Sequence, residues 1–243
     1  MRKIALQISF ILVAAFLCLN YTDARKAPKK ILVFSKTKGF RHESIPTGIE
    51  ALKQLGKKQN WQVDATEDAG AFNSATLGGY DAIVLLSNTG DVWDSTQEMA
   101  LQDYVRKGGG IAGVHAAADC EYDWPWYNQL IGAYFHSHPK IQEARILVNK
   151  QQKHPSTRTL PDTWTRTDEW YNFKQVSPAI KTIMTLDEHS YEGGNMKNGH
   201  PIAWYQEFEG GKVFYTALGH TRESYSEQAF LEHLEGGIRS VMK

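Results

Sequence analysis

A short glycine-rich stretch, residues 108–119, constrains the fold of this chain more than any other segment. It reads Gly-Gly-Gly-Ile-Ala-Gly-Val-His-Ala-Ala-Ala-Asp. The glycines end a predicted helix, and the apolar residues 111–114 are typical of a strand buried on both faces. In an open α/β sheet, ligands bind beyond the carboxyl ends of the strands. His115 stands at that position with only alanines behind it, so we predict a functional residue. The alternative is a structural histidine that is simply hydrogen-bonded.

The first 24 residues have the pattern of a secretory signal. Residues 1–24 begin with basic side chains, continue with the apolar run 4–19 and end in the small residue Ala24. This pattern predicts cleavage and an exported protein, periplasmic or secreted. The run is short for a membrane span, which needs about 20 apolar residues, so we expect no membrane-spanning segment. A lipid anchor through Cys18 is the weaker alternative, because Leu17 is a poor residue before a lipid-modified cysteine.

Residues 25–243 are enough for one sizeable domain with its own core. The whole chain has 27 basic and 27 acidic residues, and this balance gives no basic patch for a nucleic acid. Only Cys120 remains after cleavage of the signal, so no intrachain disulfide is expected. The sequence leaves a homo-oligomer open.

The order of the predicted elements indicates an α/β fold. In the first half, apolar strands alternate with helical periodicity over short connections, which favours a parallel sheet with helices on both faces. After residue 119 the chain becomes rich in aromatic residues and carries a long irregular and β-like insertion. Strands are predicted at 31–35, 61–66 (at a sheet edge), 80–86, 111–114, 141–148, 180–186, 200–208 and 212–218. Helices are predicted at 45–55, 95–105, 126–131 and 229–238.

Several polar residues follow predicted strands. Arg41 and His42 follow the first strand, Asp91 lies after the third, and His220 follows the last. Because the carboxyl ends of parallel strands share one rim, we expect His42 and His220 to converge with His115. Histidines with a nearby carboxylate bind a divalent metal such as zinc, or move protons. The alternative is a set of helix caps and solvated charges.

Two further sets of polar residues lie in the insertion. Asp168 and Glu169 precede two aromatic residues, and burial beside such rings would raise a carboxyl pKa, as a general acid needs. On a strand the two would face opposite ways, so at most one points inward. His136 and His138 share a strand face and could bind metal there, but Pro139 follows directly, and His138 could instead serve a turn.

The chain is rich in aromatic side chains, with seven Trp and eleven Tyr. Flat apolar faces with polar edges suit carbohydrate binding, although the same residues also fill ordinary cores. The candidates for stacking against a sugar are Trp93, Trp124, Trp126, Trp170 and Tyr171.

Taken together, the motifs resemble the ThuA-like family, named for trehalose utilisation. The resemblance covers nearly all of residues 25–243 in the same order. It rests on residues 37–48, 88–91, 108–119, 126–132, 168–171 and 217–221. The family is related in fold to class I glutamine amidotransferases, and the resemblance therefore implies a flavodoxin-like three-layer sandwich with a mainly parallel sheet.

The chain departs from the amidotransferase pattern at the nucleophile. Those enzymes carry a cysteine on a sharp turn after a strand, with a histidine and a glutamate further on. Here His115 occupies the turn position and Cys120 comes five residues later, although His220 and Glu223 resemble the downstream pair. With no thiol to activate, glutamine hydrolysis is not expected.

The resemblance implies an exported protein of carbohydrate utilisation. The family is linked with sugar 3-dehydrogenases, so a disaccharide or a 3-keto sugar derived from one is the expected substrate. We expect His115 or His220 to act as base, and Glu169 or Asp168 as acid or ligand. His42, Arg41, Asp91 and the aromatic residues would bind the sugar. The alternatives are a non-catalytic saccharide-binding module and a metal-dependent hydrolase of another substrate.

Overall fold

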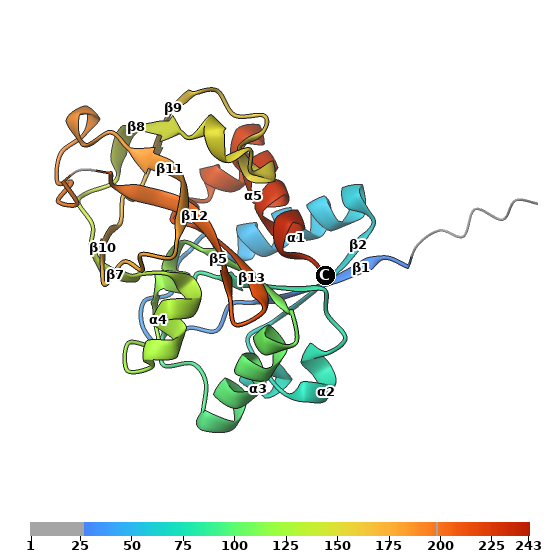
Figure 1. The fold of residues 1–243 in the computed structure, drawn as a ribbon. Helices are drawn as coiled ribbons and strands as arrows, with labels where there is room; N and C mark the ends of the chain where they lie inside the picture. The colour runs from blue at the N-terminus through green and yellow to red at the C-terminus, as the bar shows by residue number, and fades with distance from the viewer. Residues whose placement is uncertain (1–26, 198) are drawn as a thin grey trace, which may run out of the picture.

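A computed structural model describes residues 27–197 and 199–243, so the predicted signal at 1–24 lies outside the described residues. A nine-stranded sheet runs through the molecule in the order β2-β1-β3-β5-β13-β12-β11-β8-β9. Helices cover both of its faces (Figure 1). Within the described ranges, no helix is both long enough and apolar enough to span a membrane.

One half of the sheet is parallel. Its strands pair side by side in parallel register, with β2 at the edge as predicted. They are β2 (Trp61–Thr66), β1 (Lys29–Phe34), β3 (Ala82–Leu86), β5 (Gly110–Val114) and β13 (Gly211–Thr216). Because β3 and β5 are central, every one of their residues is buried. This arrangement confirms an α/β fold with a large central sheet.

The other half of the sheet is antiparallel and contains the insertion. The strands continue from β13 as β12 (Pro201–Phe208), β11 (Lys181–Leu186), β8 (Gln142–Val148) and β9 (Thr163–Asp168). The insertion therefore extends the main sheet, and β9 lies partly in a segment that the sequence analysis read as irregular. Two of the buried residues of β9, Arg166 and Asp168, are charged. The alternation of buried and exposed positions along this strand therefore does not show as an alternation of apolar and polar residues.

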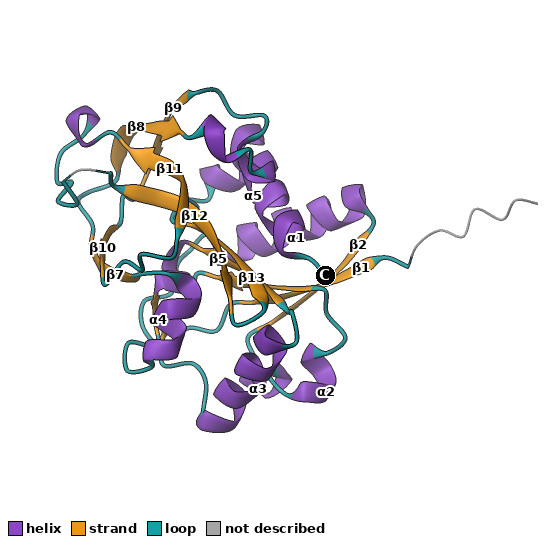
Figure 2. Ribbon diagram, viewed as in Figure 1, coloured by secondary structure: helices purple, strands orange, loops and turns teal. Residues whose placement is uncertain are grey.

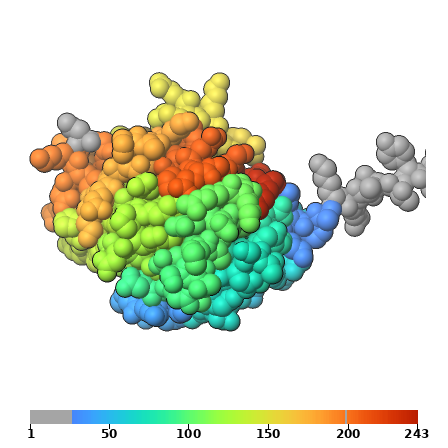
Figure 3. All heavy atoms as spheres, turned by 60° about the horizontal axis from the view of Figure 1, so that its bottom comes forward, coloured from blue at the N-terminus to red at the C-terminus, as the bar shows by residue number. Residues whose placement is uncertain are grey.

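The helices form a layer on each face of the sheet (Figure 2). On one face lie α1 (Ile45–Gln59) and α5 (Gln228–Val241). On the other lie α2 (Ser74–Leu77), α3 (Ser95–Arg106) and α4 (Pro125–Ile131). In the space-filling view, green residues that include α3 cover much of the face turned toward the viewer (Figure 3).

Helix α1 is longer than predicted, because Gly56 lies inside it instead of ending it. A Cβ at Gly56 would come within 2.6 Å of the Val63 side chain on β2. The glycine therefore permits close packing of helix against strand, and Asn60, with a φ of 57°, ends the helix.

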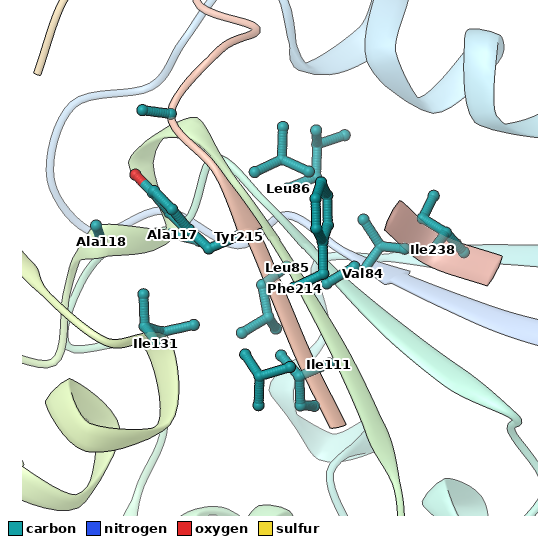
Figure 4. Close-up of a cluster of buried hydrophobic side chains, with 14 of the residues drawn as sticks. Val84, Leu85, Leu86, Ile111, Ala117, Ala118, Ile131, Phe214, Tyr215 and Ile238 are labelled. Atoms are coloured by element: carbon teal, nitrogen blue, oxygen red, sulfur yellow. The ribbon is translucent and has the colours of Figure 1, made fainter. Parts of the chain in front are cut away.

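The core lies where the central strands meet α4 and α5 (Figure 4). Apolar side chains of β3, β5 and β13 pack together there, and the alanines after β5 join them with no exposed surface. Two short pairs, β4 (Thr89–Gly90) with β6 (Asp119–Cys120) and β7 (Tyr134–Ser137) with β10 (Asn172–Lys174), connect the loops at the carboxyl end of the parallel strands.

Candidate functional site

His115 sits on a sharp turn at the end of β5. Its φ of 51° is in the left-handed region, which costs a non-glycine residue about 1–3 kcal/mol. His115 and the three alanines after it form a short 3-10 helix, and all four residues are fully buried. The geometry is that of an elbow, which projects the side chain of one residue away from the sheet.

Two hydrogen bonds hold the elbow. The Tyr215 hydroxyl donates to the carbonyl of His115 at 2.7 Å. The His115 ring lies 2.7 Å by its Nδ1 from the carbonyl oxygen of Ala217, to which Nδ1 must donate. In the neutral ring, Nε2 is then left with a lone pair and no proton. The elbow therefore aims the Nε2 atom of His115 at the rim of the sheet.

Two more histidines meet His115 at this point, as the topology predicts. His42 comes from the loop between β1 and α1, and its Nε2 lies 3.2 Å from His115 Nε2. His220 follows β13, and its Nδ1 lies 3.1 Å from the same atom. Nitrogen lone pairs this close repel one another unless a proton or a cation lies between them.

Glu169, in the loop between β9 and β10, completes the group. Its Oε2 lies 3.1 Å from His220 Nδ1 and 3.5 Å from His115 Nε2. One ligand atom from each of the four residues, the histidine–glutamate cluster of His42, His115, Glu169 and His220, lies within 4.8 Å of every other. Three imidazole nitrogens and one carboxylate oxygen thus converge on one point.

The charges of the cluster follow from its burial. Burial, with His115 and His220 close by, lowers the pKa of His42 to about 3, so this ring is neutral at pH 7. Burial alone would raise the pKa of Glu169, as the sequence analysis expected, but the close His115 and His220 rings outweigh burial and keep that pKa below its usual value. Burial lowers the pKa of His220, but the bond to Glu169 outweighs it and the net shift is upward. A neutral imidazole and an ionised carboxylate are the forms that bind metals.

Asp168 lies behind the cluster and does not face it. Its carboxylate is fully buried and accepts hydrogen bonds from the backbone N–H groups of Gly219 at 3.0 Å, His220 at 3.1 Å and Glu169 at 2.9 Å. Of the two neighbouring acidic residues, only Glu169 points into the site, which agrees with the expectation that they face opposite ways. Asp168 instead holds the backbone that carries two members of the cluster.

A cavity of about 440 Å³, here called the inner cavity, opens beside the cluster. Asp119 brings a further carboxyl group to its wall and accepts a hydrogen bond from the Tyr122 hydroxyl at 2.6 Å. Burial raises the pKa of Asp119. The cavity is lined by Phe40, His42, Asp119, Phe135, His138, Glu169, Tyr171 and His220. Its mixture of aromatic faces and convergent polar groups is typical of small-molecule sites.

Of the two histidines predicted as candidates in the insertion, only one lies at the cluster. His138 Nδ1 lies 3.1 Å from Glu169 Oε1, the oxygen turned away from the cluster, and also 2.9 Å from the carbonyl of Pro139. His136 is exposed and is not among the residues that line the cavity. His138 is thus in contact with the cluster, and His136 is not.

The predicted sugar-binding residues are scattered. Tyr171 lines the inner cavity and packs against the His115 ring in a tilted arrangement, with 4.4 Å between ring centroids. Arg41 pairs with Glu67 at 2.7 Å, and Asp91 is exposed in its loop. The indoles do not line the cavity. Trp93 and Trp170 are buried in the core, and Trp124 and Trp126 stack on each other at 5.0 Å.

Sequence reasoning did not list Phe40, Phe135 or Asp119 as site residues. Phe40 precedes the predicted His42 by two positions and is 65 % exposed. Asp119 ends the glycine-rich stretch itself. For Phe40 and Asp119, the sequence signal that could have identified them is the same, because each lies in a loop that follows a parallel strand.

The Cys120 thiol is buried and donates to the Gly90 carbonyl at 2.9 Å. Burial raises the pKa of that thiol well above its usual value. Cys120 is therefore a buried, protonated core residue, and its thiol is not positioned to act as a nucleophile.

Comparison with known proteins agrees with this description. The family model for ThuA, described as trehalose utilisation, matches residues 30–240. The chain belongs to the ThuA family. This membership supports a role in carbohydrate utilisation. A comparison with curated proteins finds no match.

Solved structures share the fold. A putative ThuA-like protein from Bacteroides uniformis superposes with a TM-score of 0.74 at 23 % identity, covering 88 % of this chain and 91 % of that one. A putative ThuA-like protein from Parabacteroides merdae gives 0.72 at 21 % identity, with 88 % and 90 % covered. A β-galactosidase from Bacillus circulans gives 0.56 at 12 % identity, where 91 % of this chain matches 32 % of that enzyme. At these identities the likeness shows the fold alone.

Proposed function

We propose that this ThuA-family protein is a metal-dependent enzyme that acts on a saccharide, a disaccharide or a 3-keto sugar derived from one. The observation that carries the proposal is the convergence of three imidazole nitrogens and one carboxylate oxygen on a single point beside a cavity. Family membership supplies the substrate class. The signal-like pattern at residues 1–24 supports action in the exported space.

The spacing of the cluster fits a zinc ion. Four ligands at about 2.0–2.1 Å in a tetrahedron lie roughly 3.3 Å from one another. Four of the six separations within the cluster are 3.2, 3.1, 3.5 and 3.1 Å, and all six are within 4.8 Å. His115 also has the outer hydrogen bond, to Ala217, that fixes a ligand histidine in one tautomer. His42 Nδ1 has no such partner among the described residues.

Because four protein ligands fill a tetrahedral site, a divalent metal held there would act as a Lewis acid toward a carbonyl or hydroxyl oxygen of the sugar only by accepting that oxygen as a further ligand. The chain's own residues would do the rest. Asp119 offers a carboxyl group on the cavity wall to give or take a proton, and His138 offers an imidazole whose Nδ1 lies 3.1 Å from Glu169. For a 3-keto sugar, whose neighbouring C–H is acidified, this combination suits elimination or isomerisation.

The first experiment measures metal content. The purified chain is stripped with a chelator, reconstituted with zinc and analysed for metal, with His115→Ala and Glu169→Gln as test variants. The wild type is expected to hold about one zinc per chain, and each variant much less. His136→Ala, which removes an exposed histidine outside the cavity, is the matched control and keeps the wild-type content. A wild type without stoichiometric metal after reconstitution excludes the metal centre.

The second experiment measures chemistry. Metal-loaded protein is incubated with 3-keto disaccharides and the products are read by mass spectrometry. A new product that depends on His115 and Asp119 supports an enzyme. Saccharide binding by calorimetry without any product would instead favour a non-catalytic binding module, whose rim would be Phe40, Phe135 and Tyr171 of the inner cavity.

A further inference from the structure

A second hollow adjoins the inner cavity and is here called the outer cavity. Its volume is about 400 Å³. It is lined by Phe40, Glu43, Ser44, Ile141, His220, Thr221, Arg222 and Glu223. Phe40 and His220 line both cavities, so the two meet at these side chains. His220 belongs to the histidine–glutamate cluster, so the outer cavity adjoins the proposed reaction centre.

Phe40 is an exposed aromatic residue whose backbone the fold holds in place. Its side chain is 65 % exposed, yet its loop is tied to the buried Thr89 by three hydrogen bonds. Lys38 N–H and Gly39 N–H donate to the Thr89 carbonyl at 2.7 and 3.3 Å, and the Thr89 hydroxyl donates to the Phe40 carbonyl at 2.8 Å. A rigidly placed apolar face loses little conformational freedom when a ligand stacks on it.

The remaining wall of the outer cavity combines one apolar side chain with three charges. Ile141 is 47 % exposed. Arg222 pairs with Glu43 at 2.8 Å, and Glu223 adds a second negative charge. Two carboxylates against one guanidinium disfavour an anionic ligand, whereas adjacent donors and acceptors suit hydroxyl groups, which do both. Apolar faces beside such a pair match a pyranose ring, with its C–H faces and its hydroxyl edge.

We infer that the outer cavity is a second sugar subsite, which binds a neutral ring linked to the ring in the inner cavity, with the linkage beside Phe40 and His220. The inference rests on the proposed function, because it needs a saccharide in the inner cavity. It makes Phe40, Ile141 and Arg222 the residues that distinguish a linked ring from a single one.

The test compares binding of one ring with binding of two. Isothermal titration calorimetry on the zinc-loaded chain uses glucose as the single ring, and trehalose, maltose and cellobiose as the linked rings. The wild type is expected to bind the best of the three disaccharides at least about tenfold more tightly than glucose. Trehalose 6-phosphate is expected to bind no more tightly than trehalose, because the outer cavity carries excess negative charge.

Ile141→Ala and Arg222→Ala separate the subsite from the inner cavity, which neither residue lines. Each is expected to weaken disaccharide binding roughly fivefold, the equivalent of about 1 kcal/mol, and to leave glucose binding unchanged. Leu147→Ala removes a similarly exposed apolar side chain of β8 outside both cavities and is the control.

The outcomes distinguish the two proposals. If glucose binds and no disaccharide binds more tightly, or if Ile141→Ala and Arg222→Ala leave a disaccharide preference intact, the second subsite is refuted and the proposed function stands. If trehalose 6-phosphate binds more tightly than trehalose, the inference that the outer cavity takes a neutral ring is refuted. If the zinc-loaded wild type binds none of these sugars, the second subsite is refuted, and the proposed function is decided by its own test with 3-keto disaccharides.

Discussion

Asp168 offers the sharpest test of how the fold positions the site. The substitution Asp168→Asn keeps the shape of the side chain and removes its charge. In the wild type, the two oxygens accept backbone N–H groups of Gly219, His220 and Glu169, and Arg166 Nη2 lies 3.4 Å from Oδ2. An asparagine replaces one acceptor by an NH₂ donor, which must then face another donor.

The cost can be worked out from these contacts. Each hydrogen bond to a charged group contributes about 1.5–3 kcal/mol, and the variant loses one or two of them. Arg166 keeps its contact with Glu227 at 3.2 Å but loses its buried partner. We expect a loss of about 3–5 kcal/mol in the free energy of unfolding, as for other broken buried charge pairs. For a domain of this size, that lowers the melting temperature by roughly 6–20 °C.

Asp94→Asn is the matched control. Asp94 accepts the backbone N–H groups of Thr96 and Gln97 at 2.9 Å each, but at the exposed N-terminus of α3, where asparagine caps a helix equally well. Urea denaturation and zinc content are measured for both variants. A stability of Asp168→Asn within about 1 kcal/mol of Asp94→Asn refutes the buried-charge reasoning. Full zinc content in a destabilised Asp168→Asn shows that Asp168 supports the fold without positioning His220.

Two further predictions concern pH and a backbone position. Burial lowers the pKa of His233 to about 3, whereas the unfolded chain titrates near 6.5, so stability is complete above pH 6.5 and falls with acid by up to about 1.4 kcal/mol per pH unit. Urea melts at pH 7 and pH 5 should therefore differ by roughly 2 kcal/mol from this group, and His233→Leu should reduce that difference; an unchanged difference contradicts the assignment. Gly219→Ala should destabilise by about 1–3 kcal/mol, because its φ is 106° and a Cβ would come within 2.9 Å of the Tyr225 hydroxyl; a neutral effect in a thermal melt would show that the turn relaxes.

The convergence of His42, His115 and His220 could be predicted because it depends only on topology. Each follows a strand of the parallel half, and parallel strands end at one rim whatever their side chains are. Because this rule about strand ends needs no knowledge of side-chain packing, it correctly brings together histidines that are 73 and 105 residues apart in the sequence.

What the sequence left open depends on contacts across the sheet. The choice between Asp168 and Glu169 is made by the pairing of β8 with β9, which buries Arg166 and Asp168 on one face. Aromatic composition also leaves the role of each tryptophan undecided, because an indole ring suits a hydrophobic core and a sugar-binding site equally well. Trp93 packs against Phe34 at 5.4 Å in the core, a contact between distant segments that no local pattern encodes.

The contacts of His115 argue for coordination and against a relay. In a catalytic triad, each group touches only the next, so a proton passes along a line from nucleophile to base to orienting carboxylate. Here His115 Nε2 lies within 3.5 Å of His42, His220 and Glu169 at once. Such an atom is one of several that compete for the same point in space. A cation at that point satisfies them all together, whereas a proton transfer could satisfy only one pair. Under the proposed metal-dependent function, His115 would therefore serve as a ligand and not as a member of a proton relay.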